Sequence, residues 1–320
     1  MKHVSIIILT YNAEEYIRKG FFDSIIKGSN LNNFKKSFIV FDNGSSDETL
    51  KLLKKRYPFI DIVYSYKNLG YGKGINCALQ YAYKKYSSEY YVLSDQDVNV
   101  EIGYLQKLID FIESKKDAGF VQPLVMQLKE KKEIYSAGHT YFGDGSCFPI
   151  KKIDRKKSFV EIPSGSILCS VVRKKALEKV GLLDERFYIY YESSDWGFRF
   201  RDKGFKNYCL YDSVVYHERN FKRTSSFQMF FVKRNKLLFW SKHDKEKFKK
   251  YQSEILLRIK NLKKVIKNMR FLNDSGLLIE YLSLREGISL ASSKIGKNQP
   301  RIQNFNKLAQ IVDNKNKKYF

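Results

Sequence analysis

Long apolar runs and paired cysteines are both missing from this 320-residue sequence. No apolar run reaches about 18 residues, so no transmembrane helix is expected. The apolar segment at 4–9 is short for a signal peptide and lacks a small-residue cleavage site. The cysteines form no Cys-x-x-Cys pair, which predicts reduced core thiols in a cytosolic protein rather than zinc ligands or disulfides. They are Cys77, Cys147, Cys169 and Cys209.

Two common nucleotide-binding motifs are absent as well. No Gly-x-x-x-x-Gly-Lys-[Ser/Thr] sequence occurs, which excludes a P-loop NTPase. Gly70, Gly72 and Gly74 lack the Gly-x-Gly-x-x-Gly spacing of the dinucleotide-binding fingerprint. They also follow the third expected strand, whereas that fingerprint follows the first strand of its fold.

Acidic residues are scarce relative to basic ones. The chain has 34 Asp and Glu against 59 Lys and Arg, a net charge of +25. Residues 241–320 alone carry 19 basic and 7 acidic residues, an excess of 12. Such a charge fits nucleic acid or an anionic membrane as a partner. A solvated lysine-rich surface is the simpler alternative.

Strand-like and helix-like segments alternate along the first 122 residues. The expected strands are 4–9, 37–41, 60–65, 90–93 and 119–122, and the expected helices are 13–27, 46–56, 74–86 and 101–114. This order predicts an α/β fold with a mostly parallel sheet flanked by helices. In such sheets the ligand lies at the carboxyl ends of the strands.

Polar residues follow four of these strands. They are Thr10-Tyr11-Asn12, Asp42-Asn43-Gly44-Ser45-Ser46-Asp47, the segment 68–76 and Asp95-Gln96-Asp97. Each loop alone is typical of an ordinary turn, but four at one edge favour a cleft for base, ribose and phosphate. Asp95 and Asp97 can converge on one hard cation, Mg²⁺ or Mn²⁺, which would bridge a diphosphate to the protein.

These motifs, in this order and spacing, resemble the family 2 glycosyltransferases with the GT-A fold over roughly residues 1–240. The triplet Asp95-Gln96-Asp97 is similar to that of rhamnosyltransferase-like members. The resemblance implies metal binding by Asp95, Asp97 and His217, which follows an expected strand at 213–216. It also implies nucleotide-sugar binding by Thr10, Tyr11, Asn12, Asp42, Asn43, Gly70, Gly74, Asn76 and Asp95.

The catalytic base is expected in the second half of this domain. The family usually has Glu-Asp-x-Asp where this chain has residues 192–195, and the first Asp is commonly the base. Ser193 stands at that place, and an alcohol is a poor base near neutral pH. Glu192 lies among aromatic residues that would raise its pKa, so we assign it the role of base. Asp195, on the same helix face, is a helper or an anchor, and an interaction of both acids with the helix dipole is the alternative.

Other residues of the second half complete the expected site. Gly165, Ser166 and Trp196 are assigned to acceptor binding by the resemblance. Arg234 falls within the apolar stripe of a helix at 227–240, and a buried guanidinium needs an anionic partner. The diphosphate or an acidic motif would satisfy it, as would a salt bridge with any nearby carboxylate. The family often has an Arg-Asn pair here, which favours a catalytic role for Arg234.

We therefore expect a GT-A catalytic domain at 1–240, with a donor half at 1–122 and an acceptor half at 123–240, and a basic helical extension at 241–320. The extension is expected to lie on an anionic membrane, to pack on the catalytic domain or to pair with another subunit of a homo-oligomer. The resemblance implies lipid-linked acceptors, so we expect a cytoplasmic protein at the inner face of the cell membrane.

The predicted activity is a metal-dependent, inverting transfer of a sugar from a UDP- or dTDP-sugar to a hydroxyl of a glycan or lipid-linked acceptor. A sugar-1-phosphate nucleotidyltransferase is one alternative, although its glycine-rich basic loop near the first strand is missing. A nucleic-acid-binding protein is another, but the acidic motifs would repel phosphate. Ser193 favours a third, a non-catalytic homologue that binds sugar nucleotides or membranes.

Overall fold

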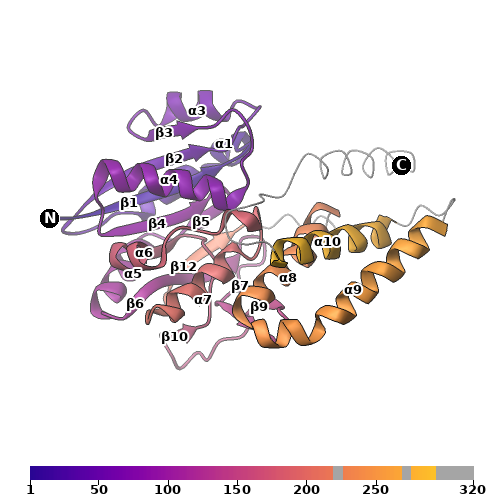
Figure 1. The fold of residues 1–320 in the computed structure, drawn as a ribbon. Helices are drawn as coiled ribbons and strands as arrows, with labels where there is room; N and C mark the ends of the chain where they lie inside the picture. Colours follow the sequence, from indigo (N-terminus) through magenta and orange to yellow (C-terminus); the bar gives the residue numbers. More distant parts are fainter. Residues whose placement is uncertain (219–225, 269–274, 293–320) are drawn as a thin grey trace. The chain divides into compact units, whose positions relative to one another are not determined.

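A mixed β-sheet forms the centre of the first of two units into which the chain divides (Figure 1). The computed structural model describes residues 1–218, 226–268 and 275–292. The first unit comprises residues 1–140, 148–184 and 192–220, and the second comprises 141–147, 185–191 and 221–320. The predicted boundary near residue 240 falls inside helix α8 (Ser226–His243), which belongs to the second unit by its contacts.

The strand order of the sheet is β10-β12-β6-β11-β4-β1-β2-β3, with β5 paired to β12 and β7 paired to β6. Strands β3, β2, β1 and β4 are all parallel, while β11 runs antiparallel to its neighbours β4 and β6. The expected parallel arrangement is thus confirmed for β1 to β4, which form the part of the sheet predicted to bind the nucleotide. The strands of the chain are β1 (Lys2–Thr10), β2 (Phe34–Asp42), β3 (Asp61–Tyr64), β4 (Tyr90–Asp95), β5 (Val98–Val100), β6 (Ala118–Gln127), β7 (Ile134–Ser136), β8 (His139–Tyr141), β9 (Cys147–Pro149), β10 (Phe159–Ile162), β11 (Ser170–Arg173) and β12 (Lys206–His217).

Helices cover both faces of this sheet because side chains alternate along each strand. In β1, Ile6 and Ile8 belong to one core with side chains of α1, α2 and α5, whereas Ile7 and Leu9 belong to another with side chains of α4, α6 and α7. All four isoleucine and leucine side chains are buried. The helices of the first unit are α1 (Glu14–Arg18), α2 (Phe21–Gly28), α3 (Thr49–Arg56), α4 (Tyr71–Tyr86), α5 (Tyr104–Ser114), α6 (Lys174–Val180) and α7 (Glu192–Asp202).

The second unit is helical where it is described. A 3-10 turn, η1 (Glu185–Phe187), precedes α8, α9 (Lys245–Asn268) and α10 (Ser275–Ser292). Phe231 of α8 and Ile279 of α10 share one apolar cluster, and Trp240 of α8 and Phe248 of α9 share another. Within the described ranges, no helix combines the length and the apolar character that a membrane span requires.

Several element boundaries differ from those expected. Gly20 adopts a φ of 81° and divides the expected helix at 13–27 into α1 and α2. The strand expected at 213–216 is the end of a longer strand, β12, which has an irregularity between Leu210 and Val214. Such an irregularity changes which side chains face the core.

Candidate functional site

The carboxyl ends of β1, β2 and β4 bring three predicted site residues together. Thr10 pairs with Asp42 in the register of β1 and β2, and Leu9 pairs with Asp95 in that of β1 and β4. The Thr10 hydroxyl donates a hydrogen bond of 2.9 Å to the buried Asp42 carboxylate. Asp42 also accepts a 3.0 Å bond from the backbone N–H of Ser45. The predicted edge is therefore built as expected, with the Asp42 carboxylate held in place.

The loop after β1 is joined to the loop after β4 by one amide side chain. Gln96 accepts a 2.7 Å hydrogen bond from the backbone N–H of Tyr11, and its own amide donates to the Tyr11 carbonyl at 3.1 Å. The Tyr11 side chain is 45% exposed, so it offers an aromatic surface beside this edge. Asn12 has a φ of 50° and accepts a 2.9 Å bond from the backbone N–H of Ser46. The sequence pointed to the two aspartates of the triplet and gave no role to Gln96.

Two residues that were predicted to bind the nucleotide sugar, Asn43 and Asn76, form hydrogen bonds mainly with backbone groups of the protein. Asn43 is buried, donates to the carbonyl of Gly70 at 3.1 Å and accepts from the N–H of Leu69 at 2.9 Å. Asn76 donates to the carbonyl of Leu183 at 2.9 Å and accepts from its N–H at 3.0 Å. These amides organise the loops beside the cleft, and a direct contact with the donor stays a prediction for both.

Steric constraints explain two glycines here, Gly70 just before α4 and Gly74 in its first turn. Gly70 has a φ of 87°, which strains any residue that carries a Cβ. A Cβ on Gly74 would lie 2.7 Å from Leu9 and 3.3 Å from the Asn43 amide. Both glycines therefore allow the 68–76 loop to approach the ends of β1 and β2, as their place in the predicted cleft requires.

Asp95, Asp97 and His217 lie at one end of the sheet. The antiparallel pairing of His217 with Val98 brings the imidazole to the acidic triplet, and its Nε2 is 3.2 Å from an Asp97 carboxylate oxygen. The Tyr71 hydroxyl donates a 2.6 Å hydrogen bond to Asp95. Burial and the nearby charge of Asp97 raise the pKa of Asp95 to about 7. An added cation would relieve the repulsion between these two carboxylates.

Two buried polar atoms of this group lack hydrogen-bond partners within the described residues, as expected of atoms that bind a divalent metal. Asp97 Oδ1 and His217 Nδ1 are buried and have no hydrogen-bond partner in the part of the chain that the structure describes. Buried polar atoms without partners are costly, so a ligand at this place would stabilise them. No three His, Cys, Asp or Glu side chains of the described residues are already arranged as a complete metal site. The donor set is nevertheless suitable for Mn²⁺ or Mg²⁺.

Glu192 begins α7 and is the carboxylate with the most unusual environment. Its side chain is buried, and Oε2 has no hydrogen-bond partner in the described residues. Burial raises the pKa of Glu192 to about 8, and the charges of Asp95 and Asp195 add to this effect. The raised pKa agrees with the sequence-based expectation. The carboxylates of Asp95 and Asp195 also raise this pKa, and their closeness to Glu192 depends on the fold, so it could not be predicted from the sequence.

Asp195 and Trp196, in the first turns of α7, are held in the core. Asp195 is fully buried and accepts a 2.8 Å hydrogen bond from Arg199, whose guanidinium also binds the carbonyls of Val180 and Leu182. This placement suits the anchor role considered for Asp195. Trp196 is buried as well, and its indole donates to the carbonyl of Gly181 at 2.9 Å. Such a tryptophan supports α7 rather than offering a surface to an acceptor.

The segment before β11 packs against Gln122 of β6. The Ser166 N–H donates a 2.8 Å hydrogen bond to the Gln122 side-chain oxygen, and a Cβ on Gly165 would lie only 2.1 Å from that oxygen. This close packing explains the glycine. Acceptor binding by Gly165 and Ser166 stays a prediction.

His139 is a residue that sequence reasoning missed. Its backbone N–H donates to the carbonyl of Ser164 at 2.8 Å, and its Nδ1 is 3.4 Å from the hydroxyl of Ser194 in α7. Burial lowers the pKa of His139 to about 4, so the ring is neutral near pH 7. No motif surrounds this histidine in the sequence, and β8 was not expected there.

Arg234 lies in the second unit, where it binds backbone carbonyls. Its guanidinium is buried and donates to the carbonyl of Arg186 and, at 3.1 Å, to that of Phe187. Burial lowers the pKa of Arg234 to about 10, and the nearby Glu286 opposes this effect. The expected buried guanidinium is therefore present. Its contact with a leaving diphosphate stays a prediction.

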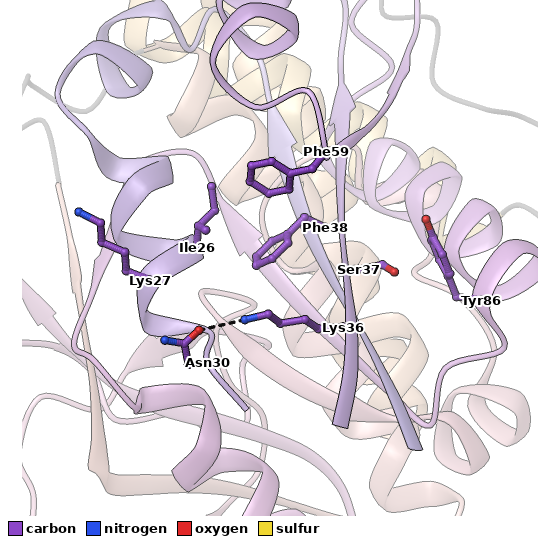
Figure 2. A pocket seen from close by; sticks show the side chains of 8 residues that line it. All are labelled: Ile26, Lys27, Asn30, Lys36, Ser37, Phe38, Phe59 and Tyr86. Atoms are coloured by element: carbon purple, nitrogen blue, oxygen red, sulfur yellow. Dashed lines mark hydrogen bonds between the residues drawn. The ribbon is translucent and has the colours of Figure 1, made fainter. Parts of the chain in front are cut away.

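A separate hollow of about 530 Å³ lies between α2 and the beginning of β2 (Figure 2). The Phe38 and Phe59 rings meet edge to face in its wall, and Lys36 donates a 3.0 Å hydrogen bond to Asn30. Lys36 is near the amino end of β2 and Asp42 is at its carboxyl end, so this hollow lies apart from the group of predicted site residues.

Comparisons with known proteins identify the family of this chain. The family model for Glycosyl transferase family 2 matches residues 5–181. An N-acetylglucosaminyl-diphospho-decaprenol L-rhamnosyltransferase of Mycobacterium tuberculosis is 24% identical over 206 residues, which cover 57% of this chain and 66% of the relative. The low-salt glycan biosynthesis hexosyltransferase Agl10 of Haloferax volcanii is 25% identical over 250 residues, covering 73% of this chain and 74% of the relative.

Solved structures share the fold at low sequence identity. GalNAc-T7 with UDP, GalNAc and Mn²⁺ has a TM-score of 0.59 at 15% identity, covering 73% of this chain and 47% of that one. The mannosyltransferase PcManGT of Pyrobaculum calidifontis with GDP-Man and Mn²⁺ has a TM-score of 0.53 at 15% identity, covering 97% of this chain and 80% of that one. Both are glycosyltransferases, and the expected GT-A fold is confirmed. The chain therefore belongs to glycosyl transferase family 2.

Proposed function

We propose that this glycosyltransferase is metal-dependent and inverting, and that its donor is a nucleotide-diphosphate sugar. The observation that carries this proposal is the group formed by Asp95, Asp97 and His217, in which two buried polar atoms have no partner among the described residues. These three residues would hold Mn²⁺ or Mg²⁺. When bound, that cation neutralises negative charge on the diphosphate of the donor.

The nucleoside of the donor would bind at the ends of β1 and β2. The exposed Tyr11 ring can stack on a base, and the fixed Asp42 carboxylate can accept hydrogen bonds from base or ribose. Thr10 supports Asp42 through its hydrogen bond, and Asn12 joins the loop after β1 to the loop after β2 through the N–H of Ser46. A UDP- or dTDP-sugar is the proposed donor; of the two solved structures compared above, one contains UDP and the other GDP-Man.

Glu192 would act as the general base. Its carboxylate would take the proton from the acceptor hydroxyl, whose oxygen then attacks the anomeric carbon as the bond to the nucleoside diphosphate breaks. Attack opposite the leaving group inverts the anomeric configuration without a covalent intermediate. Burial raises the pKa of Glu192 to about 8, so its deprotonated form is a stronger base than an ordinary glutamate.

The acceptor is proposed to be a lipid-linked glycan at a membrane surface, since one relative is named for a diphospho-decaprenol acceptor. Helix α9 supports this proposal. Leu256 and Leu257 are 48% and 57% exposed and lie on the same helix face as the exposed Lys249, Lys260 and Lys264. A face with exposed leucines among lysines fits an anionic bilayer. We propose a peripheral location at the inner face of the cell membrane.

One experiment tests the chemistry. Nucleotide release is measured from a panel of UDP-, dTDP- and GDP-sugars with Mn²⁺ or with EDTA. Asp97→Ala should abolish turnover and metal-dependent donor binding. Glu192→Gln should lower turnover by roughly 100-fold or more while sparing donor binding. Asp202→Asn, at the exposed end of the same helix, is the control. Full activity in the Asp97 or Glu192 variant would refute the role of that residue.

Ser193 favours a second candidate, a homologue that binds the donor without turnover. Serine stands where the family usually has the catalytic aspartate. Metal-dependent thermal stabilisation by one donor, with no release of nucleotide and no transfer to any lipid-linked acceptor, would support this alternative. Ser193→Asp would then be expected to create turnover.

Membrane binding is tested by flotation with vesicles. Phosphatidylglycerol vesicles should bind the chain, and phosphatidylcholine vesicles should not. Replacement of Leu256 and Leu257 by serine should weaken binding while leaving nucleotide release unchanged. Equal binding to both vesicle types would contradict the proposed electrostatic contribution.

A further inference from the structure

The loop at 185–191 contains several residues with unfavourable backbone φ angles. Tyr188, Tyr190 and Tyr191 have φ values of 64°, 67° and 72°. This left-handed region is normal for glycine and tolerated by asparagine, but it is unfavourable for a residue as large as tyrosine. Three such residues within four positions persist only when the surrounding structure holds them there.

Two consecutive side chains of α8 hold this loop. Asn235 donates to the carbonyls of Phe187, Ile189 and Tyr190 at 2.8, 2.7 and 2.8 Å. Arg234 donates to the carbonyls of Arg186 and Phe187. An Asn amide has only two N–H bonds, so at least one of them is shared between two carbonyls.

The two side chains are themselves fixed. Arg234 donates to the Asn235 side-chain oxygen at 2.9 Å, and both residues are buried. The Arg234 guanidinium lies 4.7 Å from the centre of the Phe231 ring, on which the Tyr188 ring is stacked at 5.1 Å. The loop is thus bound through its carbonyls and through one of its tyrosine rings.

The residue that follows this loop is Glu192, the first residue of α7. Tyr191 is therefore bonded directly to the residue proposed as the base. Resting on the proposed function of Glu192 as the base, we propose that Arg234 and Asn235 are positioning residues. They bind the carbonyls of the 185–191 loop and so hold the backbone of the segment that is joined to Glu192. This is a role distinct from contact with the leaving diphosphate.

The test removes the hydrogen-bonding N–H groups of Asn235 but keeps a side chain of similar size at that position. Asn235→Leu has a similar size and no N–H groups, and Lys236→Gln, which loses only a surface pair with Asp144, is the control. Hydrogen exchange of the Tyr188 and Ile189 amides, both bonded within the loop, is expected to accelerate by about tenfold or more in Asn235→Leu. The turnover number should fall by a similar factor, with donor affinity within about twofold of the unmodified chain.

A second variant separates positioning from general support. Tyr190→Gly placed in the Asn235→Leu background should recover part of the lost turnover, because glycine adopts a positive φ without strain. A purely structural role of Asn235 would not be rescued by the removal of a second side chain. Unchanged exchange and turnover in Asn235→Leu, or no recovery in the double variant, would overturn the proposal.

If Asn235→Leu does not fold, the unmodified chain and Arg234→Lys provide the test. In the unmodified chain the Tyr188 and Ile189 amides should exchange more slowly than those of the turn at 143–146, and Arg234→Lys should reduce that difference. Equal rates in the unmodified chain would overturn the proposal. No turnover of any donor by the unmodified chain would refute the proposed function instead, since hydrogen exchange needs no substrate.

Discussion

The partly buried His139 should make the protein sensitive to mild acid. Burial lowers the pKa of this imidazole to about 4 in the folded chain, against about 6.5 for an exposed histidine. On acidification the unfolded chain therefore takes up this proton first. The contribution of His139 to stability is fully present above about pH 6.5 and is lost as the pH falls from there through about 4.

The magnitude follows from the two pKa values. Between about pH 7 and about pH 4.5, a difference of this size lowers the free energy of unfolding by about 2 kcal/mol. In His139→Gln this loss should disappear. At neutral pH the variant should be less stable by about 1 kcal/mol at most, the worth of the contact with the Ser194 hydroxyl.

Urea unfolding of the wild-type chain and of His139→Gln, each at a series of pH values, measures this difference. Acidic groups that titrate in the same range contribute equally to both proteins and cancel in the comparison. The stability advantage of the wild-type chain should shrink and then reverse as the pH falls. A difference between the two proteins that stays constant from about pH 7 to about pH 4.5 would refute the reasoning.

Two further substitutions test the packing around the site. Arg199→Met leaves the buried Asp195 carboxylate without its 2.8 Å partner, so thermal or urea unfolding should show a loss of about 3–5 kcal/mol. A loss below about 1 kcal/mol would mean that Asp195 is satisfied in another way. Gly74→Ala should lower stability by about 1–3 kcal/mol because the added Cβ would lie 2.7 Å from Leu9. The matched control is Gly72→Ala in the same helix, where the nearest atom is 3.8 Å away and no loss is expected.

The sequence predicted the cleft edge well because that edge depends on local patterns and on one topological rule. Thr10, Asp42 and Asp95 each end an apolar strand, and the ends of parallel strands meet. The resemblance to family 2 glycosyltransferases implied that His217 joins Asp97 in binding a metal, and the structure puts the two side chains 3.2 Å apart.

The partners of buried polar groups could not be predicted in the same way. An asparagine that binds a ligand and one that binds a backbone look alike in a sequence, and Asn76 proves to bind the backbone of Leu183. Arg234 was expected to need an anionic partner, and the charge of Glu286 is near, but the carbonyls that it also binds, 47 and 48 positions away in the chain, were not predicted. Trp196 was expected at the acceptor and instead packs in the core. Each outcome depends on long-range packing that has no local signal.

The reciprocal amide bonds between Gln96 and the Tyr11 backbone have a thermodynamic consequence. They join the loop proposed to bind the nucleoside to the loop that carries both proposed carboxylate ligands. A ligand that orders one of these loops also orders the other, so the second ligand meets a smaller entropic cost. Nucleotide and cation should therefore strengthen each other's binding by the same factor, as linkage requires. The middle residue of the triplet then acts as the coupling between two subsites, without being a ligand of either.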